Sequence, residues 1–260
     1  VPEGVVFDTA FHQTMPPKAY MFGVPSEYYN KYAVRRYGFH GTSHRYVSNR
    51  CYELLGKPGG EGTKIITCHL GNGSSIAAIQ DGKVIDTTMG LTPLDGFIMG
   101  TRSGAVDPSV VLFIMEKENL TPQQMSDVLN KKSGMLGISG VSSDDRDIEK
   151  AIAAGNERAK LAWEMRTYEI VKYVGSFISA LGGVDAIVFT AGIGENQPMV
   201  RSEVIKSLKY RGAVLDEEKN KVHGEEMEIT TPESSVRAFV IPTNEELVIA
   251  RDTKAIVDQL

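Results

Sequence analysis

One stretch of the chain decides the fold: Ile65-Ile66-Thr67-Cys68-His69-Leu70-Gly71-Asn72-Gly73-Ser74-Ser75-Ile76-Ala77-Ala78-Ile79. It predicts an apolar strand, a glycine turn and a second apolar strand. Asp81-Gly82 is a hairpin turn signal, and residues 83–88 are predicted as the return strand. Gly71 and Gly73 allow backbone angles that other residues avoid, so main-chain amides can turn toward a ligand.

This glycine turn has two interpretations. Amides and small polar side chains (Asn72, Ser74 and Ser75) can cradle phosphate oxygens. A P-loop or a dinucleotide-binding loop would open a helix, so a glycine turn inside a β-hairpin indicates a different class of nucleotide-binding protein. The alternative is a tight hairpin connection with no ligand, and the turn alone does not decide between the two.

The composition narrows the classes of function. The chain has 260 residues, of which 42% are hydrophobic and 23% charged, enough for a sizeable core in one or two domains. A net charge of -5 argues against nucleic acid as the main partner. Cys51 and Cys68 cannot form a disulfide framework, so we expect a cytoplasmic protein. No apolar run approaches the roughly 20 residues of a membrane span, and no membrane contact is expected.

Helical spacing alternates with short apolar runs along the rest of the chain. Helices are predicted at residues 43–55, 108–118, 147–154, 156–181, 198–208 and 243–260, with another starting at Thr121-Pro122. Further strands are predicted at residues 5–8, 185–190 and 236–241, and loops at 136–143 and 192–196. Strands that alternate with helices, together with a hairpin, predict the α/β class with a mixed sheet.

A second glycine segment, Ala191-Gly192-Ile193-Gly194-Glu195-Asn196, follows a predicted buried strand and precedes a helix. Main-chain amides at the start of a helix favour an anion. The segment lacks the third glycine of a dinucleotide fingerprint, which disfavours NAD. An ordinary strand-to-helix turn is the alternative.

Two basic side chains are candidates for contact with a transferred group. Arg102 is the only charge between Asp95 and Asp107, and arginine suits bidentate contacts with carboxylate or phosphate. His40 comes just before a predicted helix, where it could donate to a developing anion. The alternatives are a solvated arginine and a histidine that fills a turn. A metal is possible for the histidine, but no spacing resembles a zinc site.

Carboxylates occur at three further positions. Asp8 ends a predicted strand, where catalytic carboxylates often lie in α/β proteins, but it could also cap the next turn. Asp144-Asp145-Arg146 precedes a helix, and most such runs are solvated caps. Glu245 opens the last helix, where acidic residues suit the positive end of the helix dipole, and a Mg²⁺ role is the sharper alternative.

Together these segments resemble the acetate kinase (acetokinase) family, in the acetate and sugar kinase/actin-like superfamily. The matching segments span the chain, at residues 6–12, 36–44, 69–75, 99–104, 142–147, 191–196 and 242–246. The resemblance implies an actin-like ATPase (ribonuclease H-like) domain with a mixed β-sheet flanked by helices. It also implies reversible transfer of the γ-phosphoryl of ATP to acetate, giving acetyl phosphate and ADP, with Mg²⁺ (or Mn²⁺) as cofactor. Related propionate kinases share much of this pattern.

The resemblance also implies a role for each segment. Asp8 matches an aspartate near the transferred group, and His40 and Arg102 match two residues that stabilise the transition state. Glu245 matches a Mg²⁺-associated glutamate, with Glu246 as the alternative. The nucleotide-binding matches are His69, Leu70, Gly71, Asn72, Gly73, Asp144, Asp145, Arg146, Gly192, Ile193, Gly194, Glu195 and Asn196.

The family's N-terminal domain has no counterpart in this sequence, which resembles the C-terminal two-thirds of the family. We therefore expect a remnant of that domain at residues 1–10, a nucleotide-binding domain at 11–245, and a closing helix at 246–260 that packs on the missing domain. An inactive nucleotide-binding fragment is one alternative. An actin-like filament subunit is another, which the segments around His40 and Arg102 disfavour. By resemblance, the chain is expected to form a homodimer.

Overall fold

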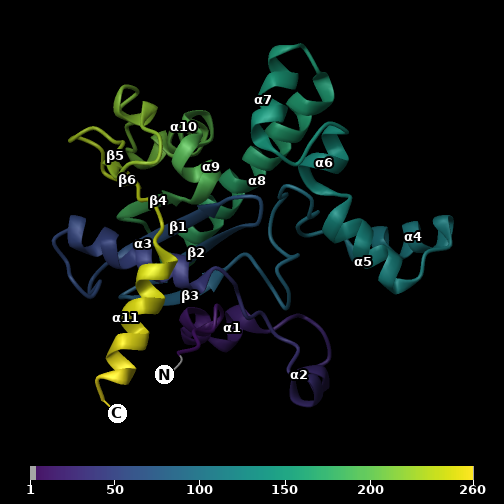
Figure 1. Ribbon diagram of the computed structural model, residues 1–260, viewed down its shortest axis with the longest axis horizontal. Helices are drawn as coiled ribbons and strands as arrows, with labels where there is room; N and C mark the ends of the chain where they lie inside the picture. Colours follow the sequence, from purple (N-terminus) through teal and green to yellow (C-terminus); the bar gives the residue numbers. More distant parts are fainter. Residues whose placement is uncertain (1–3, 260) are drawn as a thin grey trace.

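The computed structural model describes residues 4–259, and its centre is a six-stranded mixed β-sheet (Figure 1). The strands are β1 (Lys64–Leu70), β2 (Ser74–Gln80), β3 (Lys83–Thr87), β4 (Ala186–Thr190), β5 (Met227–Glu228) and β6 (Arg237–Val240). Their order is β3-β2-β1-β4-β6-β5. β1, β2 and β3 pair antiparallel, β4 lies parallel to both β1 and β6, and β5 pairs antiparallel with β6.

The predicted hairpin is confirmed. β1 and β2 pair over their whole lengths, from Lys64 opposite Gln80 to Leu70 opposite Ser74. Asp81 (φ 50°) and Gly82 (φ 75°) both have positive φ, as the commonest two-residue hairpin turn requires.

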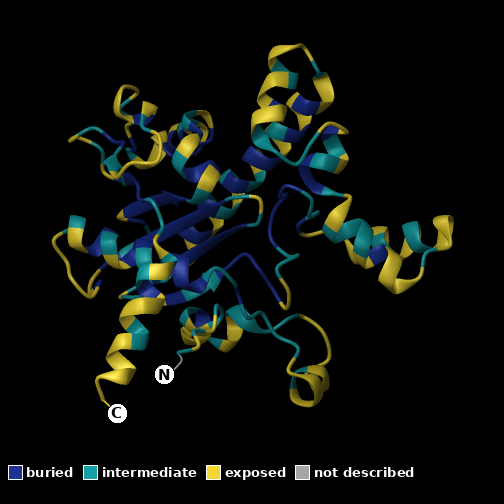
Figure 2. Ribbon diagram, in the orientation of Figure 1, coloured by how far each residue is buried: buried dark blue, intermediate teal, exposed yellow. Residues whose placement is uncertain are grey.

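The two faces of the sheet are covered by different helices. Side chains alternate along a strand, so Ile65 packs with α3 (Gly41–Leu54), whereas Ile66 and Cys68 pack with α8 (Glu157–Leu181) and α10 (Pro198–Ser207). Figure 2 shows the sheet as the most buried part of the molecule. The predicted α/β class is confirmed, and the mixed sheet flanked by helices is the arrangement that the actin-like (ribonuclease H-like) resemblance implies.

The remaining helices surround this core. α6 (Gly134–Ser139) and α7 (Asp145–Ala153) pack against α8, and α11 (Glu245–Val257) contacts α3. α4 (Pro108–Glu118) and α5 (Pro122–Lys131) extend away from the sheet (Figure 1). No helix within residues 4–259 is long and apolar enough to cross a membrane. The shorter elements are η1 (Ala10–Thr14), α1 (Pro17–Tyr20), α2 (Glu27–Tyr32), α9 (Ala191–Asn196), η2 (Lys209–Arg211) and η3 (Lys219–Lys221).

Three local predictions were wrong. Residues 5–8 form no strand: within the described chain they have no pairing partner, and Val5 and Phe7 are 75% and 72% exposed. The predicted loop at 136–143 begins inside α6, whose first amides, at Met135 and Leu136, donate to carbonyls of the loop at residues 99–100. The predicted loop at 192–196 is α9, described below. In these cases tertiary contacts, or their absence, decide the structure rather than the local pattern.

Candidate active site

Asp8 ties the start of the chain to the start of α3. It lies in a turn and not at the end of a strand. Its Oδ2 accepts a hydrogen bond from the His40 main-chain N–H (2.6 Å), and its carbonyl accepts from the Gly41 N–H (2.9 Å). A Cβ at position 41 would stand 2.1 Å from the Asp8 carbonyl oxygen, so only glycine permits this contact. The Asp8 carboxylate is thereby fixed beside His40.

His40 has a strained backbone and a well-anchored ring. Its φ of 57° is uncommon for a residue with a side chain, and such strain often occurs at functional sites. The ring Nδ1 lies 2.9 Å from the Ser75 hydroxyl, and the ring stacks on His69 with centroids 4.0 Å apart. Burial lowers the pKa of His40, the Asp8 carboxylate raises it by less, and the neighbouring Arg102 lowers it further. The lowered pKa favours the neutral imidazole at pH 7.

Arg102 and His40 converge on the glycine turn of the β1–β2 hairpin. A Cβ at Gly73 would stand 3.0 Å from Arg102 Nη1 and 3.6 Å from His40 Nε2. Neither Gly71 nor Gly73 has a positive φ, so neither uses the left-handed region that glycine permits. A side chain at position 73 would instead press on the end of Arg102, which would have to shift.

The loop that carries Arg102 is docked on the same turn. The Gly100 N–H donates to the Asn72 carbonyl (3.0 Å), and a Cβ at position 100 would stand 1.8 Å from Asn72 Oδ1. Arg102 Nη1 also donates to the Pro93 carbonyl (3.3 Å). The hairpin turn therefore holds the loop that carries Arg102 in place.

A pocket of about 610 Å³ opens beside the turn. It brings together three segments that the sequence analysis selected. They are the turn (Gly71 and Asn72), the start of α7 (Asp144, Asp145 and Arg146) and α9 (Gly192, Ile193 and Asn196). His69, Leu70, Gly73, Gly194 and Glu195 do not line it. The predicted nucleotide-binding residues thus mostly share one cavity.

The side chains at the start of α7 divide into anchors and exposed groups. Asp145 forms an ion pair (2.6 Å) with Arg166 of α8, whose side chain is 2% exposed. Asp144 caps α7 through the Arg146 N–H (2.9 Å) and pairs with the Arg146 side chain, and these contacts lower the pKa of Asp144 to about 2. The buried pair holds the pocket wall in place, and the exposed pair remains at its rim.

α9 is a short helix built by its own polar contacts. Ala191 starts it with φ 63°, and the Glu195 carboxylate accepts from the Ala191 N–H (2.8 Å) and the Thr243 N–H (3.3 Å). The fully buried Arg201 of α10 donates to the Gly194 carbonyl (2.9 Å). Gly194 and Glu195 therefore shape the segment from behind, while their neighbours in α9 face the cavity.

The carboxylates of Glu245 and Asp8 interact electrostatically, although the two residues are far apart in the sequence. Burial first, and the charge of Asp8 second, raise the pKa of Glu245. Glu246 is exposed. Within the described residues no group of three or more His, Cys, Asp or Glu side chains could hold a metal. Mg²⁺ needs only one or two carboxylates besides water, so two mutually repelling carboxylates fit it.

Sequence reasoning missed a polar cluster beneath the hairpin. His44 is fully buried in α3, with Nδ1 2.7 Å from Thr67 Oγ1 and Nε2 2.8 Å from Ser75 Oγ. His12 is also buried, and its ring centroid lies 5.7 Å from that of His44. The i, i+4 spacing of His40 and His44 could have indicated that both face β1.

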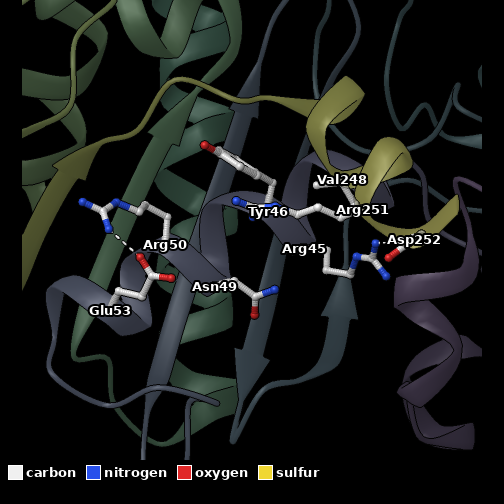
Figure 3. A pocket seen from close by; sticks show the side chains of 8 residues that line it. All are labelled: Arg45, Tyr46, Asn49, Arg50, Glu53, Val248, Arg251 and Asp252. Carbon is white, nitrogen blue, oxygen red and sulfur yellow. Dashed lines mark hydrogen bonds and ion pairs between the residues drawn. The ribbon is translucent and has the colours of Figure 1, made fainter. Parts of the chain in front are cut away.

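A second pocket, of about 500 Å³, lies between α3 and α11 (Figure 3). Two of the arginines that line it are already paired with carboxylates. Arg45 pairs with Asp252, and Arg50 pairs with both Glu53 and Glu226. Because these charges are neutralised within the chain, this pocket does not share the chemistry of the site at the hairpin turn.

Comparisons with known proteins agree with this geometry. The profile of the Acetokinase family matches residues 1–251. The acetate kinase of Carboxydothermus hydrogenoformans is 62% identical over 256 residues, which is 98% of this chain and 64% of that protein. That of Thermotoga maritima is 58% identical over 263 residues, 100% of this chain and 65% of that protein.

Solved structures give the same result. The acetate kinase of Porphyromonas gingivalis superposes with a TM-score of 0.94 at 55% identity, covering 97% of this chain and 63% of that one. A propionate kinase from Francisella tularensis gives 0.89 at 44% identity, covering 96% and 63%. The chain thus spans just under two-thirds of the length of these relatives.

Proposed function

Because this chain belongs to the acetokinase family, we propose that it provides the nucleotide site and most of the catalytic groups of an enzyme that transfers a phosphoryl group reversibly between ATP and acetate. The products in the forward direction are acetyl phosphate and ADP. The observation that carries the proposal is the convergence of Arg102 and His40 beside Gly73, next to a cavity of nucleotide size.

The chemistry suits this pair of side chains. Phosphoryl transfer passes through a loose transition state that spreads negative charge over three equatorial oxygens. Arg102 Nη1 and His40 Nε2 both lie within 4 Å of one position beside Gly73, so both can contact such a group. The acetate carboxylate is nucleophilic at pH 7, and no general base is required. Asp8 then has an orienting role, because its carboxylate already accepts the His40 main-chain N–H.

The pocket supports a nucleotide on the other side of the turn. The amides around Gly71 and Asn72 would contact phosphate oxygens, and the segments at Asp144 and Gly192 would flank the ribose and the base. Asp8 and Glu245 would hold Mg²⁺, which neutralises charge on the phosphates when bound. Without a cation, the two carboxylates oppose each other.

The experiment is a hydroxamate assay of acyl phosphate formation, with acetate and ATP, beside direct binding of a non-hydrolysable ATP analogue. Turnover that is lost in Arg102→Ala, while analogue binding is retained, would support the proposal. Failure to bind the analogue would contradict the nucleotide site itself.

Two alternatives follow from specific observations. The similarity to a propionate kinase favours a short-chain acyl kinase of broader preference, and the same assay with propionate compares the two acids. One methylene in an apolar pocket changes discrimination by only about 1–3 kcal/mol. The chain spans only about 64% of its relatives, which favours a fragment that binds nucleotide without turnover. Analogue binding without any acyl phosphate would identify that case.

The domain division and the homodimer remain proposals of the same kind. Residues 246–260 would cover a neighbouring domain, because most of the described part of α11 is exposed and only Val248 is buried within it. Sedimentation equilibrium of the purified chain would measure the oligomeric state.

A further inference from the structure

A chain of hydrogen bonds leads from the core of the protein to the ring of His40. Thr67 Oγ1 lies 2.7 Å from His44 Nδ1, His44 Nε2 lies 2.8 Å from Ser75 Oγ, and Ser75 Oγ lies 2.9 Å from His40 Nδ1. Thr67, His44 and Ser75 are all fully buried. Because water is excluded from these three residues, each proton in the chain must be satisfied by a group of the protein.

Counting protons gives the chain a direction. Within residues 4–259, His44 is the single side-chain partner of the Thr67 hydroxyl. If Thr67 donates to His44 Nδ1, neutral His44 carries its proton on Nε2 and donates to Ser75, whose own proton then goes to His40 Nδ1. Every donor is satisfied. In the reverse direction the Thr67 proton has no acceptor in a fully buried position, which is the costly arrangement.

In the described part of the protein, no other neighbour of His40 determines which ring nitrogen of His40 is protonated, so the hydrogen bonds from Thr67 through Ser75 decide it. Asp8 accepts from the main-chain N–H of His40 and not from its ring. His69 stacks against the ring face, and its own Nδ1 is bound to Ser43 (2.8 Å). Burial and three neighbouring imidazoles lower the pKa of His44, which keeps it neutral as the proton count requires.

We propose that Thr67, His44 and Ser75 are positioning residues that fix His40 as the tautomer protonated on Nε2. The Nε2–H then points at the same position as Arg102 Nη1, beside Gly73. His40 thus acts as a neutral hydrogen-bond donor to the transferred group, and it neither accepts nor releases a proton. This inference rests on the proposed function for the role of the donor, but the tautomer itself can be measured without turnover.

The first test is NMR of the chain labelled with ¹⁵N-histidine at pH 8. Long-range ¹H–¹⁵N correlations distinguish a protonated from an unprotonated ring nitrogen, and His40→Asn assigns the His40 signals by their loss. We expect Nε2 of His40 to be protonated and Nδ1 to be bare. A His40 protonated on Nδ1, or an even mixture of both tautomers, would overturn the proposal whether or not the chain is active.

The second test breaks the chain of hydrogen bonds. Ser75→Ala should let His40 populate both tautomers, and Thr67→Val should weaken the preference from one step further away. Ser75→Thr and Thr67→Ser, which keep the hydroxyls, are the matched controls and should retain the wild-type spectrum. An unchanged His40 tautomer in folded Ser75→Ala would show that the hydrogen bonds from Thr67 through Ser75 do not fix it. If that variant does not fold, the wild-type spectrum still decides the proposal.

Kinetics then separate positioning from structural support. In an active enzyme we expect Ser75→Ala to lower kcat about tenfold with the KM for ATP changed less than about twofold, because the lost interaction matters in the transition state. Ser75→Thr should recover most of kcat. A rise in KM with unchanged kcat would instead indicate a purely structural effect on the pocket. Absence of turnover in the wild type would count against the proposed function and not against the tautomer.

Discussion

The two glycine-bearing segments that line the pocket, the β1–β2 turn and α9, look alike in sequence but use glycine differently. In the turn, a Cβ at Gly73 would stand 3.0 Å from Arg102 Nη1 and 3.6 Å from His40 Nε2, so a side chain there would press on Arg102. In α9, a Cβ at Gly192 would meet no protein atom within 4 Å and would face the cavity. Glycine thus leaves room for a protein side chain in the turn and for a ligand in α9.

The supports behind the two segments differ as well. The turn stands on a layer of imidazoles and hydroxyls that connects α3 with β1 and β2. α9 is held by a buried arginine, Arg201, and a carboxylate, Glu195, that bind main-chain groups. The turn can thus transmit changes to reacting groups, whereas α9 supplies a wall of fixed shape.

The largest expected effect comes from removing the arginine that the turn approaches. Arg102→Ala should lower kcat by about 10³-fold in an active enzyme, on the scale of other phosphoryl-transfer arginines. Hydroxamate kinetics measure it, and retained binding of an ATP analogue is the control. A loss of less than about tenfold would argue against a transition-state role.

The direct comparison is Gly73→Ala against Gly192→Ala. The added methyl at position 73 displaces Arg102 by a few tenths of an ångström, so we expect a roughly tenfold fall in kcat, below the about 10²-fold that a 1 Å misplacement can cost. Alanine at position 192 meets no protein atom but faces the nucleotide cavity, so we expect any effect in the KM for ATP and little change in kcat. Equal effects at the two positions would remove the distinction drawn above.

Acidification should lower the free energy of unfolding, because buried histidines pack beneath the β1–β2 turn. Burial lowers the pKa of His12 to about 4 and that of His69 to about 3, below their ordinary value of 6.5. The unfolded chain therefore binds these protons first, and stability is full above pH 6.5 and falls below it. Each histidine contributes a loss of about 1.4 kcal/mol per pH unit between its unfolded and folded pKa values.

Urea unfolding at pH 7.5, 6.5 and 5.5 measures this slope. His12→Gln, which keeps a polar side chain without a titrating ring, should flatten it. A free energy of unfolding that is constant or rises toward pH 5.5 would show that the imidazoles are protonated in the folded state.

The smallest expected effect concerns the hydrogen exchange of α11, which within the described residues packs on neither the β1–β2 turn nor α9. Leu247 is half-buried, and Ala250 and Val257 are exposed, so hydrogen exchange should find this helix weakly protected. β1 and β2, buried on both faces, provide the internal reference. Protection of α11 equal to theirs would mean that it packs on another chain or domain.

The sequence predicted the hairpin and most helices because their patterns are local: apolar runs on both sides of the glycine turn, a capped start at Thr121 and a long periodic run in α8. It did not predict α6, because the first amides of α6 donate to carbonyls of a distant loop. It did not predict α9, because the first amide of α9 donates to the side chain of Glu195. The proposed catalytic pair, Arg102 and His40, could be selected from its unusual setting. The buried contacts of His12, His44 and Thr67, and the inward orientation of Ser75, could not be predicted, since buried polar side chains look like ordinary core positions until their partners are known.

The pairing of β1 with β2 has a consequence for folding errors. His69 lies opposite Ser75, and Thr67 opposite Ala77, on the face toward α3, while Cys68 and Leu70 lie on the other face. A slip of one residue between these strands would exchange the two faces. It would drive the imidazole of His69 into the apolar layer beneath α8 and bring a thiol and a leucine to the face toward α3. A misaligned hairpin thus loses core packing and the arrangement of the candidate site together, so a folded population with an intact core and a disrupted site cannot accumulate by this route.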